Sequence, residues 1–341
     1  MSRRRNFSPW ASWSLHLQSV VDEDPFPDGG AAPDILAWRT RARARIESVL
    51  GAMPTDVVPL DLEVTETVTL DDHVRHRIVF DTEPTMSVPA YLLVPNARTK
   101  PGSAVLAVHG HGPGKAMICG LTGRTHEHYA LQFVRNGHVV LAPDLRCFGE
   151  RQDPQWEPDG HKYDCDWNLV AATMAGINPL AQNLWDLQRS IDVLATLDVV
   201  DPERIAVAGF SYGATMSLFL AALDSRISAA IISGYLSSWR GAHSVPWNMC
   251  GSQIMFGQLG RVEHIDVVAQ VAPRPILIES GRHDPLFPID AAIATVDQLR
   301  EVYRALGAAP DLVVHDIVDG DHRWNGTAAL PFLHQWSVDR P

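Results

Sequence analysis

The sequence has few cysteines, little positive charge and no long apolar run. Its four cysteines, Cys119, Cys147, Cys165 and Cys250, form no C-x-x-C pair. We therefore expect free thiols in a reducing, cytoplasmic compartment rather than a disulfide framework. No stretch approaches the ~20 apolar residues of a membrane-spanning helix, and we expect no membrane partner.

The scarcity of positive charge argues against nucleic-acid binding. The formal net charge is −12 over 341 residues, whereas a phosphate backbone is bound by clustered Lys and Arg. The basic residues 39–45 alternate with apolar ones, and we interpret them as a solvated helix face. Arg4-Arg5-Asn6-Phe7 faintly resembles a twin-arginine export signal. Residues 10–18 contain no clean apolar segment and no small-residue cleavage site, which favours a protein that stays in the cytoplasm.

The common cofactor motifs are missing as well. Neither G-x-x-x-x-G-K-[ST] nor G-x-G-x-x-G occurs, so the glycine-rich segment 109–114 is not expected to bind phosphate. His109, His111, His126 and His128 form two H-x-H pairs, a pattern that can bind zinc. No cysteine or carboxylate completes a tetrahedral site at a recognisable spacing. We therefore expect neither a metal nor a cofactor.

The chain is organised as an N-terminal segment, residues 1–59, followed by one larger domain, residues 60–341. Residues 1–34 carry tryptophan and proline without a clear period, and we expect an arm that packs on the body or on a second subunit of a homo-oligomer. Apolar spacing predicts a helix over 35–50, ended by Gly51 and Pro54.

The larger domain predicts an α/β fold. Three short strand-like runs between residues 60 and 94 indicate an antiparallel meander. From residue 103 onward, continuous apolar strands alternate with helices, which is typical of a mostly parallel sheet covered on both faces. The predicted strands are 104–108, 139–142, 205–210, 229–233, 276–280 and 312–318, and the predicted helices are 126–136, 183–197, 212–223, 289–306 and 328–336. Insertions 147–182 and 236–266 follow strand ends, so we expect them to shape the pocket.

Ser211 is the candidate nucleophile. It lies in Gly209-Phe210-Ser211-Tyr212-Gly213, between an apolar strand and a helix. Such a turn exposes the serine hydroxyl at the edge of a sheet, and a side chain at either glycine would collide with the neighbouring backbone.

A serine needs a base, and the base needs a group that orients it. Asp284 follows the strand 276–280, and His322 follows the last strand. The order Ser211, Asp284, His322 is that of nucleophile, acid and base. There are two alternatives to this assignment. Asp284 could instead cap the helix that begins near Pro288, and Asp290 is a competing carboxylate. The alternative bases are His283, His315 and His334.

A second group of residues is predicted to bind the substrate. The N–H groups of Tyr212 and His111 are the candidate oxyanion donors, and Gly110 and Gly112 would let the backbone approach the substrate. Glu150 and Arg151 are interpreted either as an ion pair or as polar substrate contacts. Trp239 is interpreted as packing of the cap and core, or as a substrate contact.

Together these residues resemble the α/β-hydrolase superfamily over roughly 60–341. The finer resemblance is to bacterial hydrolases like dienelactone hydrolase and acetyl-xylan esterase. It is carried by the meander ending in Val88-Pro89-Ala90-Tyr91-Leu92-Leu93-Val94-Pro95, by His109-Gly110-His111-Gly112, by 144–151 and by Asp201-Pro202-Glu203-Arg204-Ile205. Dienelactone hydrolase itself uses cysteine where this chain has Ser211, and many relatives have glycine where this chain has Cys147.

The resemblance implies hydrolysis of a small-molecule ester through a serine acyl-enzyme, without a cofactor. Amidase or peptidase, acyltransferase and C–C-bond hydrolase activities remain alternatives, because one fold hosts many reactions. A non-catalytic binding protein on the same scaffold is a more distant one.

Overall fold

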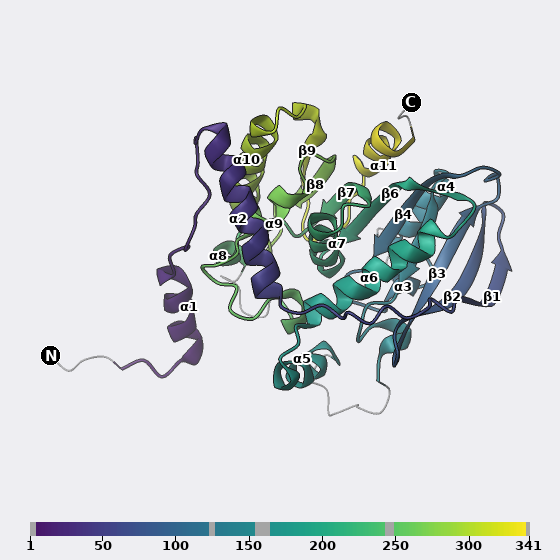
Figure 1. Cartoon of the computed structure of the whole chain (residues 1–341), viewed down its shortest axis with the longest axis horizontal. Helices are drawn as coiled ribbons and strands as arrows, with labels where there is room; N and C mark the ends of the chain where they lie inside the picture. The colour runs from purple at the N-terminus through teal and green to yellow at the C-terminus, as the bar shows by residue number, and fades with distance from the viewer. Residues whose placement is uncertain (1–4, 123–126, 154–163, 243–248, 339–341) are drawn as a thin grey trace.

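One nine-stranded sheet organises the residues that the computed structural model describes, which are 5–122, 127–153, 164–242 and 249–338 (Figure 1). The strands are β1 Glu63–Thr69, β2 His73–Glu83, β3 Met86–Pro95, β4 Gly102–Val108, β5 Val139–Pro143, β6 Val200–Phe210, β7 Ile227–Ser233, β8 Ile276–Gly281 and β9 Val313–Val318. Their order across the sheet is β1-β2-β3-β5-β4-β6-β7-β8-β9. The pairs from β1 to β5 are antiparallel, and the pairs from β5 to β9 are parallel. The predicted meander and parallel sheet are confirmed.

Helices cover both faces of this sheet. They are α1 Pro9–Ser19, α2 Ala32–Leu50, α3 Lys115–Ile118, α4 Tyr129–Arg135, α5 Asp164–Ala175, α6 Pro179–Ala195, α7 Tyr212–Leu223, α8 Trp239–Ala242, α9 His264–Val268, α10 Ile289–Ala305 and α11 Ala329–Leu333. Single turns lie at Gly149–Arg151, Gly251–Gln253, Ala269–Val271, Pro310–Leu312 and His334–Val338. None of the helices in the described part of the chain is long and apolar enough to cross a membrane.

The two faces of the sheet form two hydrophobic clusters because strand side chains alternate in direction. On β4, Leu106 and Val108 belong to the cluster that includes α2, α6, α7, α9 and α10. Val105 and Ala107, on the same strand, belong to the cluster that includes α3, α4 and α11. All four of these side chains are fully buried, as expected for a central parallel strand.

Several helix boundaries differ from the prediction. Helix α6 begins at Pro179, one turn earlier than expected, because the Asn178 side chain accepts a hydrogen bond from the Leu180 N–H at 3.1 Å. The predicted closing helix 328–336 is α11 followed by a wider π turn. The first insertion, where no helix was expected, contains α5.

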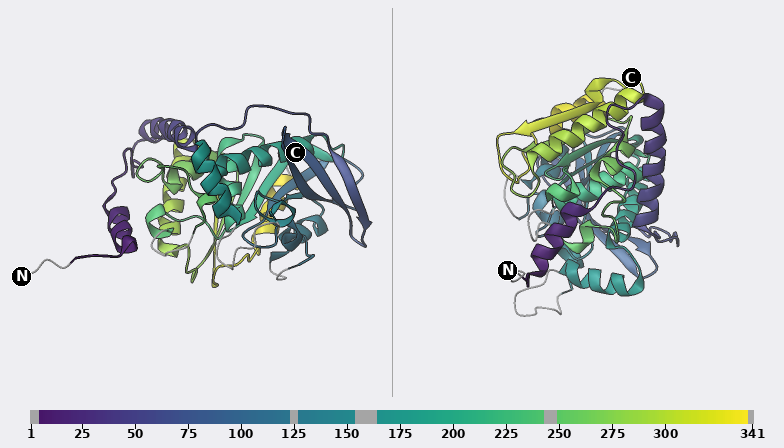
Figure 2. Two further views of the ribbon diagram at one scale, coloured as in Figure 1. Left: turned by 90° about the horizontal axis from the view of Figure 1, so that it is seen from below. Right: turned by 90° about the vertical axis from the view of Figure 1, so that its left-hand side faces the viewer.

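The N-terminal segment has two parts with different contacts. Helix α1, which sequence periodicity did not indicate, has no buried residue and lies apart from the rest of the protein (Figure 2). The chain after it contacts the body, since the Glu23 N–H donates to the Gly260 carbonyl at 2.7 Å. The division of the chain at residue 60 remains our proposal.

Helix α2 is attached to the body by arginines. The Arg39 side chain donates to the Ala269 carbonyl at 2.8 Å, Arg43 to the Ala222 carbonyl at 2.7 Å and Arg45 to the Arg261 carbonyl at 3.0 Å. The prediction of a solvated basic face is therefore wrong for these three residues. Their guanidinium groups bind backbone carbonyls of loops and helix ends on the body.

The half-buried carboxyl of Glu263 is expected to make stability depend on pH. Glu263 Oε1 accepts hydrogen bonds from the Trp239 N–H at 2.9 Å and the His264 N–H at 2.7 Å. Burial raises the pKa of Glu263 from 4.5 to about 7. The folded state therefore holds this proton more tightly than the unfolded state does, so the contribution to stability is complete at low pH and is lost as pH rises from 4.5 to about 7.

We expect Glu263→Gln to remove this pH dependence while keeping an oxygen acceptor. Relative to the variant, the natural protein should lose about 2 kcal/mol of unfolding free energy between pH 5 and pH 8. Urea denaturation at both pH values measures the difference. Glu66→Gln, on exposed β1, is the control and should run parallel to the natural protein. A Glu263→Gln variant with an unchanged pH slope would contradict the assignment.

Candidate active site

Ser211 lies at the junction of β6 and α7, in a strained backbone conformation. Its φ is 56° and its ψ is −118°, a region that non-glycine residues rarely occupy. A Cβ at Gly213 would lie 2.0 Å from the Val108 carbonyl oxygen, and one at Gly209 would lie 2.3 Å from the Gly213 oxygen. The two glycines are thus required by the close approach of helix and strands, as the sequence predicts.

Asp284, His322 and Ser211 are joined by consecutive hydrogen bonds. His322 Nδ1 lies 2.7 Å from Asp284 Oδ2, and His322 Nε2 lies 2.9 Å from Ser211 Oγ. With the Nδ1 hydrogen directed to the carboxylate, Nε2 is left to accept the serine hydrogen. The structure therefore brings together the three residues that we predict to form the triad.

Asp284 caps the turn before α10 and contacts His322 at the same time. Its other oxygen, Oδ1, accepts hydrogen bonds from the Leu286 N–H at 2.8 Å and the Phe287 N–H at 3.2 Å. One oxygen therefore orders the turn before α10 and the other contacts the imidazole. Asp290 is exposed in the first turn of α10.

The other candidate bases have different surroundings. His315 lies within β9 and contacts Ser280 Oγ at 3.0 Å. His283 is exposed and contacts Asp319 at 3.0 Å. His334 lies in the turn after α11. Neither of these contacts, of His283 or of His315, involves Ser211.

A buried glutamate that sequence reasoning missed holds the loop of His322. Glu279, on β8, accepts hydrogen bonds from the Ser233 hydroxyl at 2.7 Å, the Asn325 N–H at 2.8 Å and the Gly326 N–H at 2.6 Å. Burial raises the pKa of Glu279. A carboxyl inside an otherwise apolar strand was the available signal, because such a group requires partners.

The loop after β4 passes directly over Ser211. A Cβ at Gly110 would lie 3.0 Å from the Phe210 carbonyl oxygen and 3.6 Å from the Ser211 Cβ. The next residue, His111, has its ring 4.8 Å from the ring of Tyr212. Tyr212 is the first residue of α7, where backbone N–H groups have no partner within the helix. The loop and the first turn of α7 therefore lie beside Ser211, and the role of the His111 and Tyr212 N–H groups as oxyanion donors stays a prediction.

His109 supports this loop from inside. It is fully buried, with Nδ1 2.7 Å from the Gly110 carbonyl oxygen and Nε2 accepting the Leu145 N–H at 3.0 Å. Burial lowers its pKa, which favours the neutral ring that can both donate and accept. His109 therefore shapes the loop and does not face a ligand.

The predicted substrate contacts Glu150 and Arg151 bind other charged residues rather than each other. Glu150 accepts from Arg77 Nε at 3.0 Å and also contacts the Lys115 ammonium. Its pKa is lowered to about 2, first by the hydrogen bond from Arg77. Arg151 lies 2.9 Å from Asp186. Both side chains serve ion-pair networks beside the loop.

Trp239 belongs to the core. It is 1% exposed, and its indole Nε1 donates to the Val262 carbonyl at 2.7 Å. Its ring lies 4.2 Å from that of His264. Of the two interpretations of this residue, packing agrees with the structure, and a direct substrate contact does not agree with its burial.

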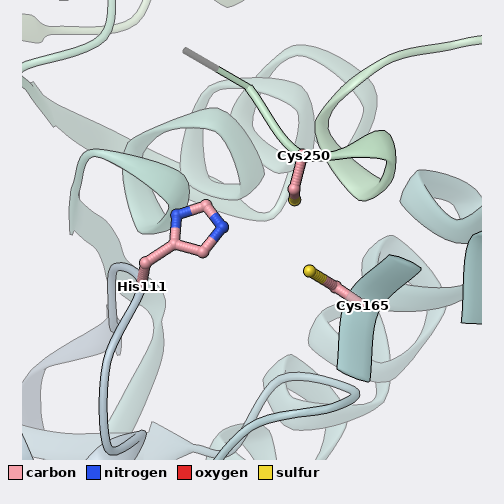
Figure 3. A group of neighbouring side chains, drawn as sticks. All are labelled: His111, Cys165 and Cys250. Carbon is pink, nitrogen blue, oxygen red and sulfur yellow. The ribbon is translucent and has the colours of Figure 1, made fainter. Parts of the chain in front are cut away.

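Among the described residues, the histidines of the H-x-H pairs do not gather around a common point, but His111 has two other neighbours. His126 lies outside the described residues, and His128 Nε2 contacts the Thr122 carbonyl at 3.2 Å. The fold instead places Cys165 and Cys250 beside His111, with the ligand atoms of all three within 4.8 Å of one another (Figure 3). The pKa of Cys165 is lowered to about 6, mainly by a hydrogen bond with Cys250 and to a lesser extent by one with His111. Wide separation in sequence concealed this cluster.

Comparison with known proteins identifies the family. A family model described as "Abhydrolase family" matches residues 17–298, so the chain belongs to this family. The match includes Ser211 and Asp284 and ends before His322. The Bacillus subtilis (strain 168) protein "Putative hydrolase YtaP" is 26% identical over 281 residues, covering 80% of this chain and 90% of that protein.

Solved structures share the fold, including the C-terminal part. A "putative acetyl xylan esterase" from Bacteroides fragilis superposes with a TM-score of 0.80 and 19% identity, covering 98% of this chain and 97% of that one. A glucuronoyl esterase from Solibacter usitatus superposes with a TM-score of 0.65 and 14% identity, covering 87% and 92%. The α/β-hydrolase fold predicted from the sequence is confirmed.

The strain at Ser211 predicts an unusual order of stability. Glycine adopts a positive φ without cost, whereas alanine keeps the strain. We expect Ser211→Gly to be more stable than Ser211→Ala by about 1 kcal/mol in urea denaturation. The matched pair is Ser217→Gly and Ser217→Ala, inside α7, where the order should reverse because glycine disfavours helix. The same order at both positions would argue against strain at Ser211.

Proposed function

We propose that this member of the abhydrolase family is a serine hydrolase that cleaves a carboxylic ester through an acyl-enzyme on Ser211. The observation that carries the proposal is the unbroken hydrogen-bonded series from Asp284 through His322 to Ser211, with spacings of 2.7 and 2.9 Å. Both hydrogen bonds lie within the range needed for proton transfer and for orientation of the base.

The first half of the reaction forms the acyl-enzyme. Ser211 Oγ attacks the ester carbonyl carbon while its proton moves to His322 Nε2. The N–H groups of His111 and Tyr212 stabilise the oxyanion of the tetrahedral intermediate. When the intermediate collapses, the bond from carbon to the alcohol oxygen breaks, and the His322 proton passes to the departing alcohol. Asp284 keeps its charge throughout and stabilises the imidazolium.

The second half returns the enzyme to its starting state. Water attacks the acyl carbon, and His322 accepts one of its protons. Collapse of the second intermediate releases the carboxylic acid and returns a proton to Ser211. The side chain of His322 is 19% exposed, so water reaches the base directly. The backbones of Gly110, which is buried, and Gly112, which is exposed, are the proposed contacts for the substrate.

An ester is preferred to an amide because the fold neighbours are named for ester hydrolysis. The Bacteroides fragilis protein is named as an acetyl xylan esterase and the Solibacter usitatus protein as a glucuronoyl esterase. Hydrolysis rates measured with matched esters, amides and C–C-bond substrates distinguish an esterase from an amidase or a C–C-bond hydrolase on the same fold. A fluorophosphonate probe, which should label Ser211, discriminates an enzyme from a binding protein.

We also propose that the protein works in the cytoplasm. Its four cysteines are all free, which is typical of proteins kept in a reducing compartment.

Removal of the nucleophile tests the reaction. We expect Ser211→Ala to lower the turnover of p-nitrophenyl acetate or butyrate by at least about 10⁴-fold, because no other group on the triad attacks the carbonyl. Ser228→Ala is the matched control: the Ser228 hydroxyl lies at the start of β7 and donates to the Ile205 carbonyl in the middle of β6, and turnover of this variant should be unchanged. Residual turnover of Ser211→Ala near the natural rate would refute the proposal.

Replacement of the acid tests the orientation of His322. In Asp284→Asn the amide nitrogen can donate to Nδ1, which favours the wrong tautomer, and we expect kcat to fall by about 10⁴-fold with little change in KM. Asp290→Asn, on the exposed first turn of α10, is the control. Circular dichroism checks the fold, because Asp284 also accepts two backbone hydrogen bonds. Equal activity of the two variants would instead indicate a different acid.

A further inference from the structure

We propose that His111, Cys165 and Cys250 bind one Zn²⁺ ion beside the active site, with a fourth coordination position open to water. The ligand atoms of these three residues lie within 4.8 Å of one another. In tetrahedral coordination, Zn–S bonds of about 2.3 Å and Zn–N bonds of about 2.1 Å put neighbouring ligand atoms about 3.5–3.8 Å apart. Closure around the ion therefore requires movements of about 1 Å or less.

The three residues come from separate elements that meet at this point. His111 follows β4, Cys165 is in the first turn of α5, and Cys250 precedes the turn Gly251–Gln253 (Figure 3). Their side chains point toward a common centre (Figure 3). A cluster of this kind differs from a lone cysteine because each ligand depends on a different part of the fold.

His111 and Cys250 are each held by packing that does not involve the other ligands. The ring of His111 lies against Tyr212 and, at 5.5 Å, against Phe148. The Cys250 N–H donates to Gln253 Oε1 at 3.2 Å, and Gln253 Nε2 donates to Thr215 on α7 at 2.9 Å. Preorganisation of this kind lowers the cost of gathering the ligands around an ion.

Direct contact between α5 and the turn at Gly251 holds together the two elements that carry the cysteines. A Cβ at Gly251 would lie 2.0 Å from the Leu169 side chain on α5, so the turn and the helix are in direct contact. Cys165 is buried, Cys250 is half-buried and His111 is exposed. The sulfurs therefore lie on the protein side of the site, and solvent reaches it from the side of His111.

The donor set selects a soft divalent ion. Two thiolates and a neutral imidazole favour Zn²⁺ over Mg²⁺ or Ca²⁺, which prefer oxygen ligands. Two thiolates also balance the charge of Zn²⁺, which suits a partly buried site. Three protein ligands leave one position for water, as in zinc sites that are not purely structural. The site is separate from the proposed triad, although His111 contributes its backbone N–H to the proposed oxyanion hole and its side chain to the metal site.

Metal binding to the reduced, full-length protein tests the proposal. The protein is reduced with a phosphine and freed of metal, its four thiols are counted, and Zn²⁺ is titrated in competition with a chromophoric chelator. We expect one Zn²⁺ per chain. Co²⁺ bound in its place should show a thiolate-to-cobalt charge-transfer band, which requires a sulfur ligand.

Ligand variants locate the ion. Cys165→Ser, Cys250→Ser and His111→Ala should each weaken Zn²⁺ binding by at least about 100-fold, since even outer-shell changes cost 10–100-fold, and the two serine variants should reduce the cobalt band. Cys147→Gly is the thiol control. Cys147 has a φ of 73°, which glycine adopts freely, and binding should be unchanged.

Three results would overturn the site. These are no binding of Zn²⁺ by a protein with four titratable thiols, undiminished binding by Cys165→Ser/Cys250→Ser, or a cobalt complex without the charge-transfer band. Melting curves of each variant without metal verify that it is folded. None of these measurements depends on ester hydrolysis, so the metal site and the proposed reaction succeed or fail separately.

Discussion

The close approach of α7 to the ends of β4 and β6 is the constraint on which the site depends. With 2.0 Å between a Gly213 Cβ and the Val108 carbonyl oxygen, no side chain fits between helix and sheet. The chain can make this turn only by placing Ser211 at φ 56°, a cost of about 1–3 kcal/mol that the surrounding structure must offset. Burial of every side chain of β4 stabilises the fold and offsets this cost. In this strained conformation the Ser211 hydroxyl points toward His322 and not into the helix.

Fixed charges and hydrogen bonds then hold the loops that reach Ser211. His109 is hydrogen-bonded on both ring nitrogens and shapes the loop that carries His111. Glu279 binds the two N–H groups that follow His322 at Asn325 and Gly326. Buried polar groups of this kind are costly when unpaired, so each loop is held in one position. Preorganisation of the site is in this sense a property of residues that never touch the substrate.

Much of this arrangement could be predicted because its signals are local in sequence. Apolar runs marked β4 to β9, and Gly209 with Gly213 marked the turn at Ser211. The chain order of Ser211, Asp284 and His322 identified three residues that the structure brings together. The helical form of α5 was missed because its apolar periodicity is weak. Capping by Asn178 was missed although Asn178-Pro179 is a local helix-start signal. The partners of Glu279, and the meeting of His111 with Cys165 and Cys250, depend on long-range packing. Spacing along the chain contains no trace of such contacts.

The attachment of α2 by arginines has a consequence for synthesis of the protein. This helix is made early, yet Arg43 binds a carbonyl 179 residues further along, and Arg39 contacts one 233 residues away. At about 5–20 residues per second, the ribosome adds those partners roughly 10–45 s after α2 has emerged. During this interval the apolar side of α2, with Trp38 and Ile46, has no sheet to cover. The nascent chain therefore leaves the apolar residues of α2 uncovered for most of its translation.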